Sequence, residues 1–324
     1  STAVAGSGHW GIRWLNALVG TVNVLLTWHV GRRFLNAPAG LLAAAVLAVG
    51  APYVITSRFV YTNALPLFSI LLNLLAFHRL TERGAGPAHS LLFGVTLALL
   101  LNTKYVAYAY VLALAASILL DHRPLLRAPG LWIGAVVGVL GLLPVLLWNA
   151  RYDWASYRWQ IAHLASRGLP SSGTIPSHLY HAWGYLTGPV AALGAAGLAR
   201  LRTPRERLLT IVASFLLLPV LLSPASSPRN LSTGLVPLLL LAGARLPGNL
   251  AAWSRRAAAA AFLTLLLGAA LYGTGTVVNL HAASSLPQST IVPAIRRDAA
   301  GWPALADALD DGSGPVFCVD YSVA

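Results

Sequence analysis

The sequence predicts an all-α polytopic membrane protein of about ten transmembrane helices, followed by the start of an outer soluble α/β domain. Of the 324 residues, 57% are hydrophobic and only 10% are charged, where a soluble domain carries about 25% charged residues. The mean hydropathy is +0.69, and apolar runs of helical length recur along the chain. So few charged side chains exclude an ordinary soluble protein, and the apolar content excludes a disordered one.

The individual spans follow from length and from the residues between them. A spanning helix needs about 20 mainly apolar residues, and the links between the apolar runs hold proline, glycine or charge, which end helices. The predicted spans are 12–31, 37–56, 59–78, 88–102, 105–120, 130–148, 179–199, 207–223, 231–246 and 257–279. Residues 1–280 are the predicted transmembrane domain. Residues 281–324 turn polar and are predicted to begin an outer soluble domain that continues beyond Ala324.

The basic residues predict which way the protein faces. One set of alternate loops holds 13 basic and 3 acidic residues, and the other holds 9 and 6 over longer segments. Because cytoplasmic loops carry an excess of Lys and Arg, the first set is predicted to be cytoplasmic and both chain ends to lie outside. The first set is Arg32, Arg33, Arg79, Arg83, Arg123, Arg127, Arg200, Arg202, Arg205, Arg207, Arg245, Arg255 and Arg256, and the second is Arg13, Arg58, Lys104, Arg151, Arg158, Arg167, Arg229, Arg296 and Arg297.

The stretch from Ser90 to Leu120 is apolar except for Asn102, Thr103 and Lys104 at its centre. Cytoplasmic-type charge flanks both sides, so the stretch must cross the membrane an even number of times. Two helices of this length each span about 22–24 Å, short of a hydrocarbon core of about 30 Å. The turn is therefore expected below the outer surface, where a lysine needs protein or water around it. We expect Lys104, the only lysine, to point into an outward-facing polar cavity.

The longest outer loop, residues 149–178, is predicted to contain a helix from Trp154 to Ser166 with Asp153 as its N-cap. Apolar side chains fall on one face of this helix, and it is expected to lie on the outer membrane surface as an amphipathic segment. The residues of that face are Trp154, Tyr157, Ile161 and Leu164. Two asparagines within predicted spans, Asn23 and Asn73, are expected to hydrogen-bond between helices.

The remaining polar residues suggest a site at the outer membrane boundary. The sequence has no phosphate-binding glycine loop, dinucleotide fingerprint, zinc motif or nucleophile elbow, so no cofactor or metal is assigned. The arginines form no stripe with interleaved aromatics, which argues against nucleic acid. Cations where lipid meets water suit a phosphate group. The candidate phosphate-binding residues are Lys104, Arg58 and Arg229, and the possible substrate-lining residues are Asn63, Asn102, Tyr105, Asn149, Arg151, Asp153, Trp154 and Gln160.

Several of these residues have simpler alternative roles. Arg58 could extend to outer lipid headgroups, and Arg229 could be an ordinary loop charge. Asp153 could be only a helix cap, and the tryptophans of the outer loop, Trp154 among them, could form only an interfacial belt. These alternatives stay open at the level of sequence.

One run of residues resembles a known family. The run PVLLWNARYDWASYRWQIAH (Pro144–His163) is similar to a segment of bacterial glycosyltransferase family 39 proteins. That family includes dolichyl-phosphate-mannose protein mannosyltransferase-like enzymes and relatives of lipid A aminoarabinose transferases. Three further segments are similar to its second transmembrane helix, its K-Y turn and the entry to its outer domain. They are Ile12–Phe34, Leu99–Tyr108 and Gly301–Leu309.

The resemblance implies a GT-C fold and an inverting transfer of a hexosyl or pentosyl group at the outer face of the bacterial inner membrane. The donor would be a polyprenyl-phosphate-linked sugar, and the acceptor a lipid, glycan or protein. An Asp of the first outer loop would act as general base, and Lys104 matches the lysine of the K-Y turn. That loop would precede Ser1, so the base is expected upstream, and this segment alone is expected to be inactive. Asn63 stands where many members carry Asp, and a divalent metal finds no support in these residues.

Two other functions remain as alternatives. A transporter or flippase of lipid-linked sugars would also need basic residues around a cavity, but it should show midplane charge and internal repeats, and the sequence shows neither. A non-catalytic membrane scaffold gains some weight from Asn63. The sequence of the preceding outer loop would discriminate, because an acidic pair there favours the enzyme.

Overall fold

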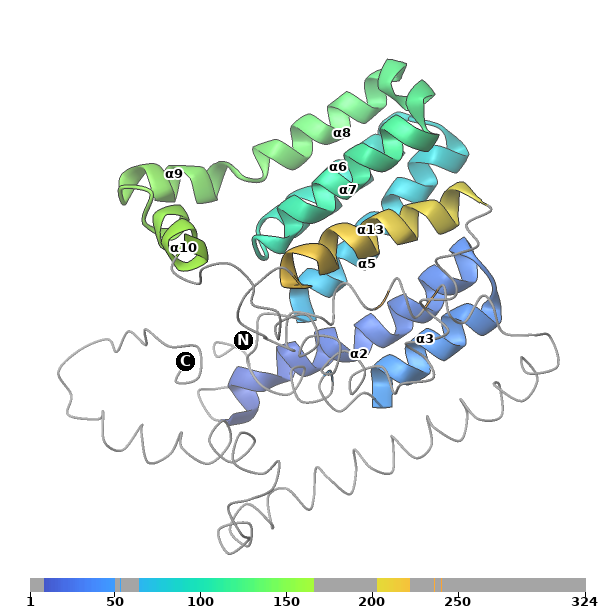
Figure 1. Cartoon of the computed structure of the whole chain (residues 1–324), viewed down its shortest axis with the longest axis horizontal. Coiled ribbons are helices and arrows are strands. Elements are labelled where there is room, and N and C mark those ends of the chain that lie inside the picture. The colour runs from blue at the N-terminus through green and yellow to red at the C-terminus, as the bar shows by residue number, and fades with distance from the viewer. Residues whose placement is uncertain are drawn as a thin grey trace, which may run out of the picture. The chain divides into compact units, whose positions relative to one another are not determined.

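The structure, a computed structural model, describes residues 9–49, 53, 64–165, 203–221, 236 and 240. All of these lie in the first of two compact units, Ser1–Phe262. The described residues form helices and include no strand (Figure 1). The helices are α2 (His9–Phe34), α3 (Ala37–Val49), α5 (Ala64–Arg83), α6 (Pro87–Leu101), α7 (Val106–Asp121), α8 (Pro129–Leu140), α9 (Leu143–Arg151), α10 (Ala155–Ala165) and α13 (Pro204–Leu221), with a 3-10 turn at Arg123–Arg127.

Most of the predicted spans within these residues are helices with nearly the expected bounds. The predicted pair of short helices is confirmed, with 15 residues in α6 and 16 in α7. α5 runs five residues past its predicted end, to Arg83, because Glu82 and Arg83 favour helix and the left-handed Gly84, with φ +83°, ends it. The predicted spans 179–199 and 257–279, most of 231–246 and the C-terminal domain lie outside the described residues.

Helix α13 begins three residues before its predicted start because its first turn is capped. The backbone N–H of Glu206 donates to the Thr203 hydroxyl at 3.2 Å, and the Thr203 N–H donates to the Glu206 carboxylate at 3.0 Å. This reciprocal pair is a capping box. It satisfies backbone donors that a helix N-terminus otherwise leaves without partners.

The predicted single span 130–148 is wrong in one respect, because it is broken into α8 and α9 at Gly141 and Leu142. Pro144 explains the break: it has no N–H to donate to Leu140, and its ring clashes with that carbonyl. Together the two helices form a stretch of 23 residues, Pro129–Arg151. By length and composition, this stretch and α5 are the two among the described residues that could cross a membrane.

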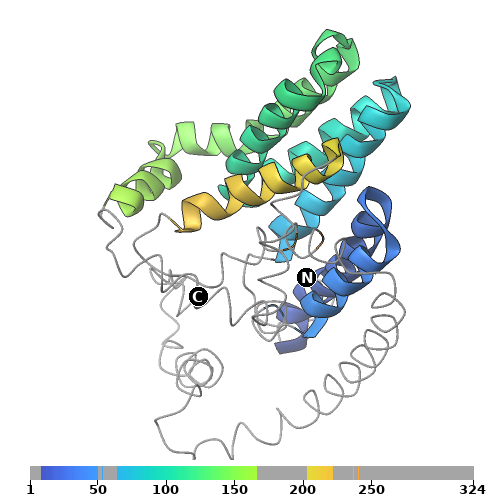
Figure 2. The same ribbon diagram turned by 45° about the vertical axis from the view of Figure 1, so that its right-hand side comes forward.

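Small residues bring several helices close together. α2 packs on α3 and α5, α5 on α6, α6 on α8, and α7 on α13 (Figures 1 and 2). A Cβ added to Gly94 of α6 would lie 2.6 Å from the carbonyl oxygen of Gly134 in α8. Between α2 and α3, a Cβ on Gly31 would lie 2.3 Å from the Cα of Gly40. Such glycine contacts are typical of helices that associate within a bilayer.

Buried amides join the helices in the core, as expected for Asn23 and Asn73. The Asn73 Nδ2 donates to the Thr96 hydroxyl at 2.9 Å, and its Oδ1 accepts from the Tyr110 hydroxyl at 3.1 Å. This one side chain therefore links α5, α6 and α7. The Asn23 Nδ2 donates to the carbonyl of Ala64 at 2.7 Å and joins α2 to α5.

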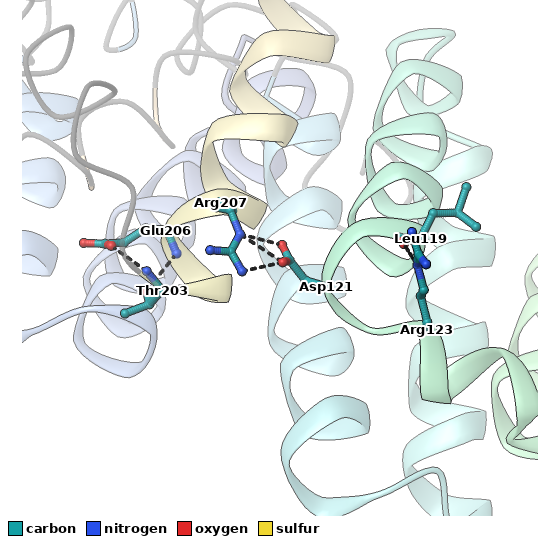
Figure 3. Close-up of polar contacts among 6 residues, drawn as sticks. All are labelled: Leu119, Asp121, Arg123, Thr203, Glu206 and Arg207. Carbon is teal, nitrogen blue, oxygen red and sulfur yellow. Dashed lines mark hydrogen bonds and ion pairs between the residues drawn. The ribbon is translucent and has the colours of Figure 1, made fainter.

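Ion pairs join the helices at one end of the bundle, and Figure 3 shows the pair of Arg207 and Asp121. The Arg207 Nε lies 2.9 and 3.0 Å from the two carboxylate oxygens of Asp121, at the end of α7. Arg205 donates to Glu82 at 2.7 Å and to the carbonyl of Arg33 at 3.4 Å. The start of α13 therefore meets the ends of α2, α5 and α7. We call this end of the bundle the arginine end. Its basic residues Arg33, Arg205 and Arg207 all belong to the set predicted to be cytoplasmic.

The two ion pairs of the arginine end should contribute unequally to stability. The Asp121 side chain is 7% exposed, whereas Glu82 and Arg205 are 47% and 41% exposed. Asp121→Ala should lower the free energy of unfolding more than Glu82→Ala does, because Asp121 is the more buried carboxylate and the Arg207 Nε lies close to both of its oxygens. The matched Glu82→Ala should cost at most about 0.5 kcal/mol. Thermal unfolding in detergent measures both variants, and equal losses would contradict this assignment.

Candidate functional site

The turn between α6 and α7, residues 102–105, lies at the opposite end of the bundle from the arginine end. Polar groups of this turn form hydrogen bonds within the protein. The Thr103 N–H and hydroxyl both donate to the carbonyl of Leu100, at 3.0 and 2.7 Å. The Asn102 Nδ2 donates to the carbonyl of Ala98 at 2.8 Å and to that of Gly141 at 2.6 Å. Asn102 therefore fastens this turn to the break between α8 and α9.

Lys104 is held at the tip of this turn and is half-buried. Its carbonyl accepts a hydrogen bond from the N–H of Ala107 at 2.9 Å, which begins the first turn of α7. Burial lowers the pKa of the Lys104 ammonium group from its ordinary value, because a charged form loses solvation in an apolar environment. An anion bound against the amine would offset this loss.

Three tyrosines pack against one another beside Lys104. The rings of Tyr105 and Tyr157 meet edge to face with centroids 5.6 Å apart, and those of Tyr105 and Tyr108 are 6.1 Å apart. The hydroxyls of Tyr108 and Tyr157 share a hydrogen bond of 2.7 Å. Because Tyr157 belongs to α10, this tyrosine cluster docks the short helix onto the start of α7. In Figure 1, α10 folds back below α9.

Asn149 organises the elbow between α9 and α10, residues 152–154. Its side chain is 1% exposed. The Asn149 carbonyl accepts from the N–H of Trp154 at 2.7 Å and from that of Tyr152 at 3.2 Å. Its Oδ1 accepts from the Ser156 hydroxyl at 2.7 Å, and its Nδ2 donates to the carbonyl of Val145 at 2.9 Å. One residue thus connects the last turn of α9 to the first turn of α10.

The expectation that Asp153 is an N-cap is wrong. Asp153 and Trp154 have left-handed backbones, with φ 52° and 55°, whereas an N-cap residue is normally extended. The helix begins at Ala155, and the Asp153 carboxylate pairs with the Arg158 guanidinium instead. Each left-handed residue other than glycine costs roughly 1–2 kcal/mol, so the hydrogen bonds of Asn149 must stabilise this conformation.

The outer surface of the elbow is aromatic and basic. Trp148 and Tyr152 are half exposed, and their rings lie 4.9 Å apart. The Arg151 guanidinium lies 6.0 Å from the centre of the Tyr152 ring, and Trp154 is 46% exposed. Indole rings and guanidinium groups together are typical of a lipid–water boundary.

Comparisons with known proteins support these observations. Residues 1–148 match the family model of dolichyl-phosphate-mannose-protein mannosyltransferases. Two solved structures of ArnT from Cupriavidus metallidurans, one apo and one bound to undecaprenyl phosphate, superpose with a TM-score of 0.59 at 20% and 18% identity. Each comparison covers 95% of this chain and 57% of the ArnT chain. No curated protein sequence matches the chain.

The chain therefore shares its helical fold with the ArnT structures, and its first 148 residues match the mannosyltransferase family model. The expected helical fold is thereby confirmed, while the number of ten spans and the outer C-terminal domain stay predictions. The chain spans little more than half of the ArnT structures, so the activity and substrates of the whole protein are proposals.

The structure brings many of the predicted site residues to one end of the bundle. These are Asn102, Lys104, Tyr105, Asn149, Arg151, Asp153, Trp154 and Gln160, and we call this the Lys104 end. The Asn102 amide is occupied there with backbone carbonyls, and the Asn149 amide with the carbonyl of Val145 and the Ser156 hydroxyl. Arg58, Asn63 and Arg229 lie outside the described residues. No group of three metal-ligating side chains occurs among the residues described.

Sequence reasoning missed the role of Tyr108, Tyr157 and Ser156. Tyr108 lies four residues after Lys104, one helical turn away, and this spacing could have indicated it. Tyr157 was placed on the lipid-facing side of α10, but it packs on α7 instead. No local pattern marks Ser156, because its partner Asn149 belongs to another helix.

The environment of Lys104 can be tested by its titration, because the chain has no other lysine. A short acetic anhydride pulse modifies only the neutral amine. Because burial lowers the pKa, half-maximal acetylation of the Lys104 peptide should occur at a lower pH in the folded protein than in the denatured protein. Mass spectrometry measures the modified fraction. Identical midpoints in the two states would contradict a half-buried Lys104.

Proposed function

We propose that the protein is a membrane glycosyltransferase that takes a sugar from a polyprenyl-phosphate donor and that Lys104 binds the donor's phosphate. The observation that carries this proposal is the half-buried position of the only lysine, at a turn beside tyrosines. An ammonium group there suits a phosphate monoester or diester at the membrane boundary. The family match and the undecaprenyl phosphate bound to ArnT support the same ligand class.

In the transfer reaction, Lys104 would stabilise charge on the leaving phosphate. An acceptor hydroxyl attacks the anomeric carbon, the bond between that carbon and the phosphate oxygen breaks, and the configuration inverts. The bonding electrons leave with the polyprenyl phosphate, so negative charge grows on the phosphate as the bond breaks. A fixed ammonium group stabilises this charge more in the transition state than in the ground state. The proton of the acceptor passes to a carboxylate that acts as general base.

The two ends of the bundle support an outward-facing Lys104. Basic residues gather at the arginine end, and the positive-inside rule places such an end in the cytoplasm. The Lys104 end then faces outward, at the outer face of the inner membrane. The acceptor on that side is a lipid, a glycan or a protein.

The role of Lys104 is tested by substitution in the full-length protein. Lys104→Ala should reduce release of undecaprenyl phosphate from an undecaprenyl-phosphate-linked sugar by 100-fold or more, the usual effect of losing a transition-state donor. Lys104→Arg should retain part of the activity because it keeps the charge. Membrane insertion should not change in either variant.

Arg127→Ala is the matched control, because Arg127 is exposed between α7 and α8 at the arginine end, and its activity should equal that of the wild type. Near-wild-type release by Lys104→Ala would refute the phosphate role. Binding of undecaprenyl phosphate without release from any linked sugar would instead indicate a transporter or a scaffold.

The two arginines outside the described residues should act mainly in binding. Arg58→Ala and Arg229→Ala should weaken the affinity for undecaprenyl phosphate, measured by native mass spectrometry in detergent, by about 10-fold each, as expected for the loss of one charge-assisted contact. An unchanged affinity in both variants would remove these arginines from the site.

A further inference from the structure

The backbone turns sharply at the elbow between α9 and α10, and few hydrogen bonds stabilise this turn. Two consecutive residues, Asp153 and Trp154, are left-handed without being glycine. Such a conformation persists only where the surroundings impose it. Both neighbouring helices end there, so their last carbonyls and first N–H groups need partners. Among the described contacts of this elbow are the pair of Asp153 and Arg158 and three hydrogen bonds to Asn149, two at its carbonyl and one at its Oδ1.

Asn149 contacts both sides of the elbow at once. Its carbonyl receives the N–H of Trp154 at 2.7 Å, and its Oδ1 receives the Ser156 hydroxyl at 2.7 Å. Its Nδ2 is fixed by the carbonyl of Val145, so the amide cannot rotate freely. The direction in which α10 leaves α9 is therefore set by Asn149.

That direction decides where Tyr157 lies. Tyr157 is one residue after Ser156 in the first turn of α10, and it reaches α7 through a ring contact with Tyr105 and a hydroxyl contact with Tyr108. Tyr105 directly follows Lys104 in the chain. A change in the elbow would move Tyr157 away from the turn and open the surroundings of the lysine to water.

We propose that Asn149 is a positioning residue for Lys104, acting through the elbow and through the docking of Tyr157 on the α6–α7 turn. The asparagine touches no reacting group in this role. Its functional consequence rests on the proposed binding of the donor phosphate by Lys104, whereas its structural consequence, the burial of the Lys104 amine, does not.

The test uses two variants that remove the same hydrogen bond from opposite sides. Asn149→Ala removes the acceptor, and Ser156→Ala removes the donor while leaving the buried asparagine in place. Ser156→Thr keeps a hydroxyl on the same carbon and serves as the rescue. Asn36→Ala is the matched control, because the Asn36 Oδ1, like that of Asn149, accepts one short hydrogen bond next to a helix start, from the N–H of Ala39 at 2.8 Å, but at the arginine end.

The first readout is the pH midpoint of acetylation at Lys104 in the full-length protein. The midpoint should move upward, toward that of an exposed lysine, in Asn149→Ala and Ser156→Ala, because the amine regains solvation. It should stay at the wild-type value in Ser156→Thr and Asn36→Ala. Wild-type midpoints in both Asn149→Ala and Ser156→Ala would overturn the proposal. An equal shift in Asn36→Ala would also overturn it, because the effect would then be general loosening.

The second readout separates positioning from catalysis. With an undecaprenyl-phosphate-linked sugar as donor, Ser156→Ala should lower kcat several-fold, which is less than the loss in Lys104→Ala, because a displaced Lys104 keeps its charge but stabilises the leaving phosphate less well. Ser156→Thr should restore kcat. A loss in Ser156→Ala as large as that in Lys104→Ala, or a wild-type kcat in Ser156→Ala, would overturn the positioning role. If the wild type neither binds nor uses such a donor, the proposed function fails, and the acetylation midpoints still decide the role of Asn149.

Discussion

Two asparagines hold the backbone where the helices at the Lys104 end stop being helical. The Asn102 side chain donates to the carbonyl of Gly141 at the break between α8 and α9. At the elbow before α10, the backbone carbonyl of Asn149 accepts two N–H groups and its Oδ1 accepts the Ser156 hydroxyl. Near the hydrocarbon core, water cannot supply such partners, so irregular backbone has to be satisfied from within the protein. Asn102 meets this requirement at the turn that presents Lys104, and Asn149 meets it at the elbow.

The two ends of the bundle are built from different interactions, and this difference fits their proposed surroundings. The arginine end uses ion pairs, with Arg205 and Arg207 joining α13 to the ends of three other helices. Such pairs tolerate water. The Lys104 end uses amide hydrogen bonds and aromatic packing around one half-buried amine. A site that binds a lipid phosphate away from water needs a cation in apolar surroundings, because opposite charges attract more strongly there. The Lys104 end provides such surroundings.

The sequence predicted the helical elements well, because length and apolar content decide them and both are local. The short pair α6 and α7, with Lys104 at its turn, followed from charge on both sides of an apolar stretch. The break at Gly141 was missed because Pro144 occupies an otherwise apolar run and many helices tolerate such a proline. The left-handed residues Asp153 and Trp154 could not be predicted, since partners from two helices impose them. The tyrosine cluster was missed for the same reason: Tyr108 and Tyr157 are 49 residues apart.

The most direct measurement of the central claim is a protection experiment on the only lysine. The full-length protein is acetylated at fixed pH with undecaprenyl phosphate, with undecaprenol, or with neither. If Lys104 binds the phosphate, undecaprenyl phosphate slows acetylation of Lys104 at least several-fold, and undecaprenol, which has the same chain without the charge, does not. Equal acetylation rates in all three samples, or equal protection by the alcohol, would contradict the account.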